Sequence, residues 1–211
     1  MNIKLTIAYD GTPFHGWQIQ PNVITIQGEL QRVLERILGH QVTIHGSGRT
    51  DAGVHAHGQV ANFQTDSAIF PNALLPALNG LLPSEIRVIE VEQVPLDFHA
   101  RLSVKAKTYE YRLWRLPVIS PFQQRYVAIA DYYIDCGAVD YATRDLCGTH
   151  DFTSFCAAST EKLDRVRTVQ EASWDRRDEE WILTIQANGF LKYMVRTIVG
   201  TLIEVGRGRM S

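Results

Sequence analysis

The chain has 211 residues, with 21 Lys and Arg against 23 Asp and Glu, which gives a formal net charge of -2. Hydrophobic residues make up 45% and charged residues 21%, a globular composition that excludes a disordered tail, a collagen-like repeat and a coiled coil. The three cysteines lack metal-binding or redox spacing. No apolar run approaches the ~20 residues of a membrane span, and no export signal begins the chain. We therefore expect a cytoplasmic protein with free thiols.

The near-neutral total hides two basic segments. Residues 99–125 hold six basic residues and one acidic residue, and residues 192–211 hold four and one. A charge run is ordinarily a solvated face of a strand or helix, and charge alone favours that interpretation. Such segments are also typical of surfaces that bind phosphates, because Lys and Arg attract a polyanion while acidic residues elsewhere repel it.

The first half of the chain predicts alternating strands and helices. Residues 3–9 alternate apolar and polar side chains, as a half-buried strand does. Apolar residues at helical spacing predict a helix over residues 26–38, with Thr25 as its N-cap and Gly39 as its stop. The remaining elements are a short strand over 41–45, a strand over 54–63, a helix over 71–82 that Pro76 should bend or divide, and a strand over 86–94.

The second half repeats the order of strand, helix and strand. It predicts a strand over residues 101–116, a helix over 135–146 closed by Gly148, strands over 166–174 and 181–187, and an amphipathic helix from Phe190 to Gly206. We therefore expect an α+β fold of two similar small α/β units, residues 1–98 and 99–211. Without a low-complexity linker, their mainly antiparallel sheets should merge or pack, with helices on the outer faces.

One loop is chemically distinctive: residues 46–53 read Gly-Ser-Gly-Arg-Thr-Asp-Ala-Gly. Its glycines indicate positive φ or a close backbone approach, although such a segment is ordinarily a simple turn. Arg49 and Asp51 are two positions apart, so an extended backbone would direct both to one face. A nearby guanidinium keeps a carboxylate ionised, as a nucleophile must be. The spacing fits neither a phosphate-binding nor a dinucleotide-binding loop, which leaves a candidate carboxylate site.

The segment Gly48–Ala56, Gly-Arg-Thr-Asp-Ala-Gly-Val-His-Ala, resembles the signature of the tRNA pseudouridine synthase A family. Five further segments resemble motifs of that family in the same order, namely Tyr9–Gln18, Asp97–Arg101, Lys107–Arg112, Gly148–Phe155 and Met194–Gly200. Ser47 departs from the small apolar residue that the family commonly has. Typical members also continue a few dozen residues beyond position 211, so we expect an incomplete second domain.

The resemblance implies isomerisation of uridine to pseudouridine at positions 38 to 40 of the tRNA anticodon stem-loop, without cofactor or metal. It implies a central active-site cleft and a homodimer. Asp51 would be the nucleophile, at C6 of the base or at C1′ of the ribose. Tyr109 would stack on the extruded base and help to remove the C5 proton. Arg196 would keep Asp51 ionised, and Arg49 would fill the gap left by the flipped base or contact a phosphate.

Each assignment has an ordinary alternative. Tyr109 alternates with Tyr111 along one strand, so we expect one of the two to face the core. Arg196 on an amphipathic helix would by itself be a solvated side chain. The histidines His45, His55 and His57 suggest a zinc site, but catalytic zinc needs three convergent ligands, and polar strand residues near a substrate groove are the better interpretation.

The basic segment 99–125 begins just before Tyr109 and would flank the site. Its candidate phosphate contacts are Lys105, Lys107, Arg112 and Arg115, which alternation distributes over at least two faces. Two other functional classes stay open: a catalytically silent RNA-binding module and, more remotely, a histidine-based metallohydrolase.

Overall fold

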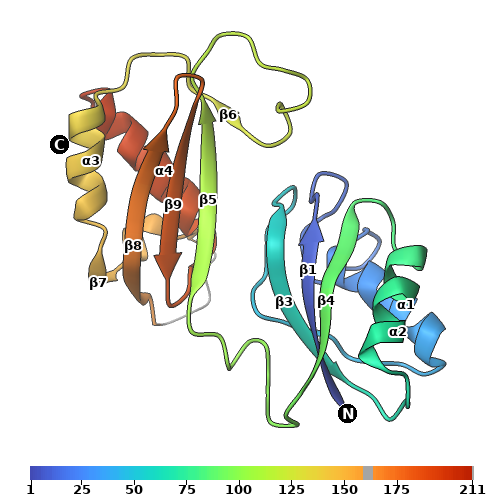
Figure 1. The fold of residues 1–211 in the computed structure, drawn as a ribbon. Coiled ribbons are helices and arrows are strands. Elements are labelled where there is room, and N and C mark those ends of the chain that lie inside the picture. The colour runs from blue at the N-terminus through green and yellow to red at the C-terminus, as the bar shows by residue number, and fades with distance from the viewer. Residues whose placement is uncertain (159–163, 211) are drawn as a thin grey trace. The chain divides into compact units, whose positions relative to one another are not determined.

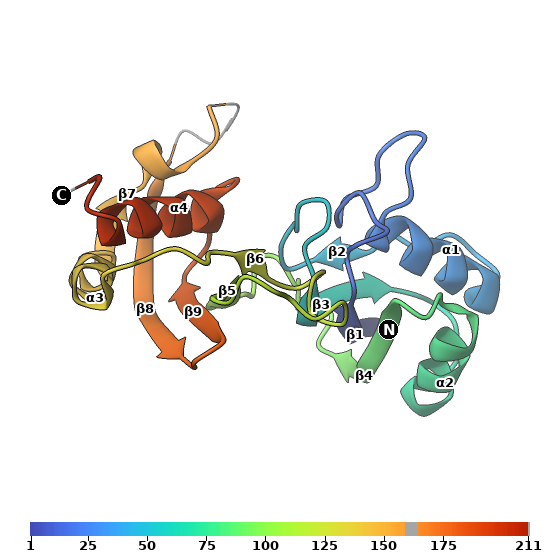
Figure 2. The same cartoon turned by 90° about the horizontal axis from the view of Figure 1, so that it is seen from above.

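Two compact units make up the chain, and both belong to the α+β class that the sequence predicts. The computed structural model describes residues 1–158 and 164–210. The units comprise Met1–Val104 and Lys105–Ser211, and Ser211 itself lies outside the described residues. Each unit has one largely antiparallel sheet with two α-helices on one of its faces (Figures 1 and 2).

The first sheet has four strands in the order β2-β3-β1-β4, with antiparallel pairing throughout. Its strands are β1 (Asn2–Tyr9), β2 (His45–Gly46), β3 (Ala56–Gln64) and β4 (Ile86–Val94). Because side chains alternate along a strand, β1 directs Ile3, Leu5 and Ile7 into the core. The helices α1 (Ile26–Leu38) and α2 (Pro71–Leu81) cover this face of the sheet (Figure 2).

Local signals set the ends of α1, as predicted. The Thr25 side chain accepts a hydrogen bond from the Gly28 N–H (3.3 Å), and Gly39 follows the helix with a φ of 75°. Pro76 does not divide α2, which is one continuous helix. Asn79 anchors α2 to β4 by accepting a hydrogen bond from the Val88 N–H (2.9 Å) and donating one to the Val88 carbonyl (2.8 Å). These tertiary contacts offset the local cost of the proline.

The strand predicted over residues 41–45 is almost absent, because only His45–Gly46 pairs with β3. The backbone before it is satisfied differently. The carbonyl of Ile44 accepts a hydrogen bond from the side-chain amide of Gln27 on α1 (2.9 Å). At Ile44, a side chain 17 positions away thus takes the place of a strand partner.

The second sheet has five strands in the order β6-β5-β9-β8-β7. They are β5 (Lys107–Trp114), β6 (Ala128–Ile129), β7 (Gly148–Asp151), β8 (Val166–Arg176) and β9 (Glu180–Ala187). The strands β5 and β6 pair in parallel, and the other neighbouring strands of this sheet pair antiparallel. The helices α3 (Cys136–Arg144) and α4 (Met194–Gly206) lie on one face (Figure 1), and a short 3₁₀ helix, η1 (Thr153–Phe155), follows β7. Across the described ranges, no helix is long and apolar enough to cross a membrane.

Several elements of the second half differ from the prediction. The short strand β6 has no predicted counterpart, and α4 begins at Met194 and not at Phe190. Two further differences follow from hydrogen bonds of the backbone. The strand expected from residue 101 begins at Lys107, because the N–H groups of Leu102 and Ser103 donate to the His99 carbonyl (3.0 and 2.8 Å) and form a turn. Gly148 was expected only to close a helix. It has a φ of 111° and begins β7, which pairs with β8 at the sheet edge. The strand that begins at Gly148 depends on pairing with the distant residue Val169 on β8, and no local sequence signal indicates this pairing.

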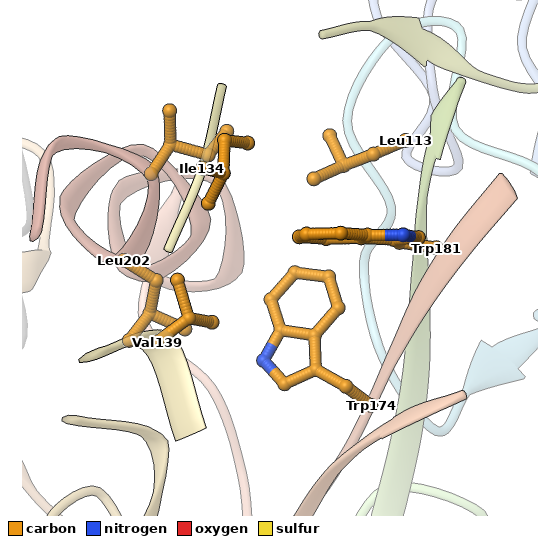
Figure 3. A pocket seen from close by; sticks show the side chains of 7 residues that line it. Leu113, Ile134, Val139, Trp174, Trp181 and Leu202 are labelled. Carbon is orange, nitrogen blue, oxygen red and sulfur yellow. The ribbon is translucent and has the colours of Figure 1, made fainter. Parts of the chain in front are cut away.

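An apolar hollow lies inside the second unit, between its two α-helices and the sheet (Figure 3). Trp174 and Trp181 lie side by side there, with ring planes at 72° and centroids 6.3 Å apart. The hollow is lined by Leu113, Ile134, Val139, Trp174, Trp181, Leu202 and Ile203. It is too narrow for a water molecule, so it is a packing feature of the core.

Candidate active site

The Asp51 loop, which we define as residues 46–53, lies between β2 and β3 and is fastened to β3. The Ser47 N–H donates to the Val60 carbonyl (2.8 Å). The Ser47 hydroxyl donates to Gln59 Oε1 (2.6 Å), and Gln59 Nε2 donates to the Gly48 carbonyl (2.8 Å). One glutamine side chain therefore fixes the first half of the loop, through Ser47 and through Gly48.

A second loop holds the residue next to Asp51. This supporting loop, residues 10–18, follows β1. Its Trp17 N–H donates to the Thr50 carbonyl (3.0 Å), and the Tyr9 hydroxyl hydrogen-bonds with the Thr50 hydroxyl (2.8 Å). The Gly53 N–H donates to the Phe14 carbonyl (3.3 Å). The structure thus brings together two of the sequence motifs, and the backbone on both sides of Asp51 is held in place.

Glycines permit this close approach. A Cβ atom on Gly16 would lie 2.6 Å from the Thr50 carbonyl oxygen, and Gly16 also has a φ of 85°. A Cβ atom on Gly46 would lie 2.6 Å from the Trp17 indole ring, which is buried. Both the positive φ and the close contact predicted for the Asp51 loop are present, since Gly53 has a φ of 74°.

Asp51 is half-buried, whereas Arg49 is exposed. Within the described residues the two side chains form no ion pair with each other. The Asp51 carbonyl accepts a hydrogen bond from the Val54 N–H (3.2 Å), which closes a turn. The side chain of Asp51 is therefore presented by a fixed backbone, and Arg49 is left to make contacts outside the loop.

The histidines of the first unit occupy separate places. The ring of His45 lies against that of His99, with centroids 4.6 Å apart. Partial burial, followed by repulsion from His99, lowers the pKa of His45. His55 Nδ1 accepts a hydrogen bond from the Gly11 N–H and lies 3.1 Å from the Asp10 carboxylate, and His57 is exposed. In the described part of the chain, no group of three metal-ligating side chains forms.

Tyr109 stands on β5 of the second unit and is half-buried. Its ring and that of Phe190 form a T-shaped pair, with centroids 4.9 Å apart and planes at 79°. The expectation that one of the two tyrosines faces the core and the other does not is wrong, because Tyr109 and Tyr111 both pack against the core of the second unit. Residues two positions apart on a strand share one face, so the sequence already contained this answer.

Arg196 lies in the first turn of α4 and is exposed. Within the described residues it forms no ion pair. Tyr193 precedes the helix with a φ of 62°, and the Lys192 ammonium lies 5.4 Å from the centre of its ring. The beginning of α4 thus presents two cationic side chains, Lys192 and Arg196, to solvent.

The four basic residues expected to contact phosphates have different surroundings. Lys105 is exposed just before β5, and Lys107 is half-buried at its start. Arg112 lies 3.7 Å from Glu110 and 3.6 Å from Glu180, so two carboxylates already compensate its charge.

Arg115 has a structural environment. It donates hydrogen bonds to the carbonyls of Ala130 and Tyr132, the latter at 2.8 Å. Its guanidinium also lies 4.3 Å from the centre of the Trp181 ring. Arg115 therefore holds the segment after β6, a role that charge patterning did not predict.

One further motif forms a local turn in the second unit. Asp151 accepts hydrogen bonds from the Thr153 N–H (2.9 Å) and the Thr153 hydroxyl (2.6 Å), at the junction of β7 and η1. These bonds, from the side chain first and the backbone second, lower the pKa of Asp151. Sequence reasoning missed this turn, and the spacing of Asp and Thr two positions apart is the signal that predicts it.

Comparison with known proteins gives consistent results. The profile of the family described as tRNA pseudouridine synthase matches residues 5–103 and 142–211. The tRNA pseudouridine synthase A of Halalkalibacterium halodurans is 49% identical over 211 residues, which cover 99% of this chain and 80% of that protein. The tRNA pseudouridine synthase A of Anoxybacillus flavithermus is 51% identical over 207 residues, which cover 98% of this chain and 84% of that protein. A solved Cbf5-Nop10-Gar1 complex matches with a TM-score of 0.39 and 11% identity, over 95% of this chain and 54% of its own, which is too distant to support an argument. The chain belongs to the tRNA pseudouridine synthase family.

Proposed function

We propose that this protein isomerises uridine to pseudouridine at positions 38 to 40 of the tRNA anticodon stem-loop, with Asp51 as the nucleophile. The observation that carries the proposal is the match to the tRNA pseudouridine synthase family over residues 5–103, which include the Asp51 loop. The structure of the Asp51 loop also supports the proposal, because Tyr9 and Trp17 hold Thr50, the residue that precedes Asp51. A fixed backbone is what precise attack on a substrate requires.

The reaction conserves all atoms of the nucleotide. The bond between N1 and C1′ breaks, the uracil turns, a bond forms between C5 and C1′, and the proton on C5 leaves to a base while N1 gains one. No electrons are transferred and no water is consumed. The residues therefore need to supply a nucleophile, a surface for the base and proton transfer, and we propose no cofactor or metal.

The proposed roles follow from these needs. Asp51 attacks C6 of the base or C1′ of the ribose, and its carboxylate leaves again before the product dissociates. Arg196 supplies a positive charge for this carboxylate. Tyr109 stacks on the extruded uracil, a contact worth ~1–3 kcal/mol per base, and its phenol assists removal of the C5 proton. Arg49, which is exposed, fills the gap in the RNA stem or contacts a phosphate.

The RNA-binding surface is proposed to include Lys105 and Lys107 ahead of Tyr109. Arg112 and Arg115 contribute less to it than the exposed Lys105, because carboxylates and backbone carbonyls already occupy their guanidinium groups. We also propose that the protein acts in the cytoplasm as a homodimer, which size-exclusion chromatography with light scattering tests.

Tritium release from tRNA tests the function directly. The protein is incubated with tRNA transcripts that carry 5-tritiated uridine, and a transcript with cytidine at positions 38 to 40 serves as the control. We expect release from the first transcript alone. Binding of both transcripts without any release would replace the proposal with a catalytically silent RNA-binding module, and release from the control transcript would contradict the positions.

A further inference from the structure

Two asparagines are buried on the helix-free side of the first sheet. Asn2 on β1 and Asn62 on β3 are 0% and 2% exposed, although they alternate with the residues that face the core. Buried amides are normally retained only where their hydrogen-bonding groups find partners. Their partners here lie in the segment that follows β4.

The two side chains form one connected network with that segment. Asn2 Nδ2 donates to the carbonyls of Pro95 (2.9 Å) and Phe98 (2.8 Å). Asn62 Nδ2 donates to Asn2 Oδ1 (3.0 Å), and Asn62 Oδ1 accepts a hydrogen bond from the Ala100 N–H (2.9 Å). Both amide groups are thus engaged, and we call this network, with residues 95–100, the asparagine clamp.

The clamp lies between two parts of the candidate site along the chain. The ring of His99, inside the clamped segment, lies against that of His45, which directly precedes the Asp51 loop. In the other direction, the chain passes from the first unit to the second at Val104–Lys105 and reaches Tyr109 on β5 a few residues later. The clamp therefore fixes the last part of the first unit before the chain continues to Tyr109.

We propose that Asn2 and Asn62 are positioning residues for the isomerisation: by clamping residues 95–100, they fix the point from which the Tyr109 strand departs. This inference rests on the proposed function, because that reaction requires Asp51 and Tyr109 to act on one uridine. Asn62 acts through the Ala100 N–H and through Asn2, not by contact with RNA. Loss of its side chain releases the segment and leaves the Asp51 loop intact, since that loop is fastened by Gln59, Tyr9 and Trp17.

The chain offers a matched control. Gln64 lies two positions after Asn62 on the same face of β3, and its Nε2 donates to the Leu96 carbonyl in the same segment (3.2 Å). Gln64 is exposed, so water replaces this hydrogen bond when the side chain is removed. Both Gln64→Ala and Asn62→Ala therefore remove a hydrogen bond to the clamped segment. The bond lost in Gln64→Ala is exposed to water, and the bonds lost in Asn62→Ala are buried.

Limited trypsinolysis tests the clamp without reference to activity. Trypsin cleaves after Arg101 and Lys105, which are exposed and follow the clamped residues. We expect Asn62→Ala to accelerate cleavage at these two sites about tenfold, because cleavage follows the population of the opened segment. Cleavage after Arg87 on β4, and the cleavage pattern of Gln64→Ala, should stay as in the wild type. A wild-type rate after Arg101 in Asn62→Ala, or an equal rise at Arg87, would overturn the proposal.

Steady-state kinetics then tests positioning. Asn62→Ala and the isosteric Asn62→Leu should both lower kcat for tritium release and leave KM for tRNA unchanged, at a temperature where circular dichroism shows full folding. Gln64→Ala should match the wild type in both parameters. An unchanged kcat in both Asn62 variants contradicts a positioning role. Failure of the proposed function is distinguishable, because the wild type would then release no tritium while the trypsin result stands.

Discussion

The two units carry their candidate site residues in different ways. Asp51 lies in a loop that is held by backbone contacts with a second loop and by glycines that allow them. Tyr109 and Arg196 stand on regular elements, the strand β5 and the helix α4. The position of Asp51 therefore depends on the backbone path of two loops. The positions of Tyr109 and Arg196 depend on a regular strand and a regular helix, so there the identity of the side chain matters most. Substitutions should therefore act differently in the two units.

The largest effect is expected from Gly16→Ala. The new Cβ atom would meet the Thr50 carbonyl at 2.6 Å, in a residue with a φ of 85°. Strain of this kind costs ~1–3 kcal/mol, and relief requires movement of the Asp51 loop. We expect loss of tritium release and a lower midpoint of thermal unfolding. Gly80→Ala in α2 is the control, because nothing lies within 4 Å of its Cβ position, and it should retain full activity.

Tyr109→Phe tests a single side chain on a regular strand of the second unit. The ring and its contact with Phe190 remain, while the phenol is lost. We expect single-turnover rates to fall by about 10²–10⁴, the usual contribution of general acid–base catalysis. Tyr111→Phe removes the neighbouring hydroxyl on the same strand face and should leave the rate unchanged. Equal rates for both variants would contradict the role of the Tyr109 phenol.

A smaller effect is expected from the basic residues before β5. Lys105→Ala should weaken tRNA binding and reduce the slope of log K against log salt by about one. Filter binding at several salt concentrations measures both quantities. Arg32→Ala, which removes an exposed charge paired with Glu29 on α1, is the control. An identical salt slope for Lys105→Ala and the wild type would remove Lys105 from the RNA-binding surface.

The smallest effect concerns the pH dependence of stability and the neighbouring rings of His45 and His99. Because the pKa of His45 is lowered in the folded protein, the unfolded chain binds more protons near the ordinary pKa of histidine. The free energy of unfolding should therefore decrease as the pH falls from about 7 to about 5. Urea unfolding at both pH values measures this, and His45→Gln should reduce the decrease. The same decrease in this variant would exclude His45 as its source.

Much of the fold follows from local signals, and the remainder depends on distant contacts. Thr25 and Gly39 predict the ends of α1 because capping involves neighbouring residues only. The hydrogen bond that the Ile44 carbonyl accepts within the predicted strand was not predictable, because its donor, Gln27, lies 17 positions away. The shared face of Tyr109 and Tyr111 was predictable from strand periodicity.

The candidate site shows the same division. Asp51 could be proposed as a site residue from its loop sequence and from the family resemblance, because both depend on consecutive residues. Its support could not, since Tyr9 and Thr50 meet across 41 positions. The structural role of Arg115 was also hidden, because its carbonyl partners belong to a segment without a periodic pattern.

The central claim is that Asp51 is the nucleophile of a uridine isomerase. Its most direct test is tritium release from uridine-labelled tRNA by Asp51→Asn, with tRNA affinity measured on the same preparation and Asp66→Asn, an exposed carboxylate of the same unit, as the control. We predict that Asp51→Asn releases no tritium and binds tRNA with wild-type affinity, while Asp66→Asn behaves as the wild type. Tritium release by Asp51→Asn at a rate close to that of the wild type would contradict the account.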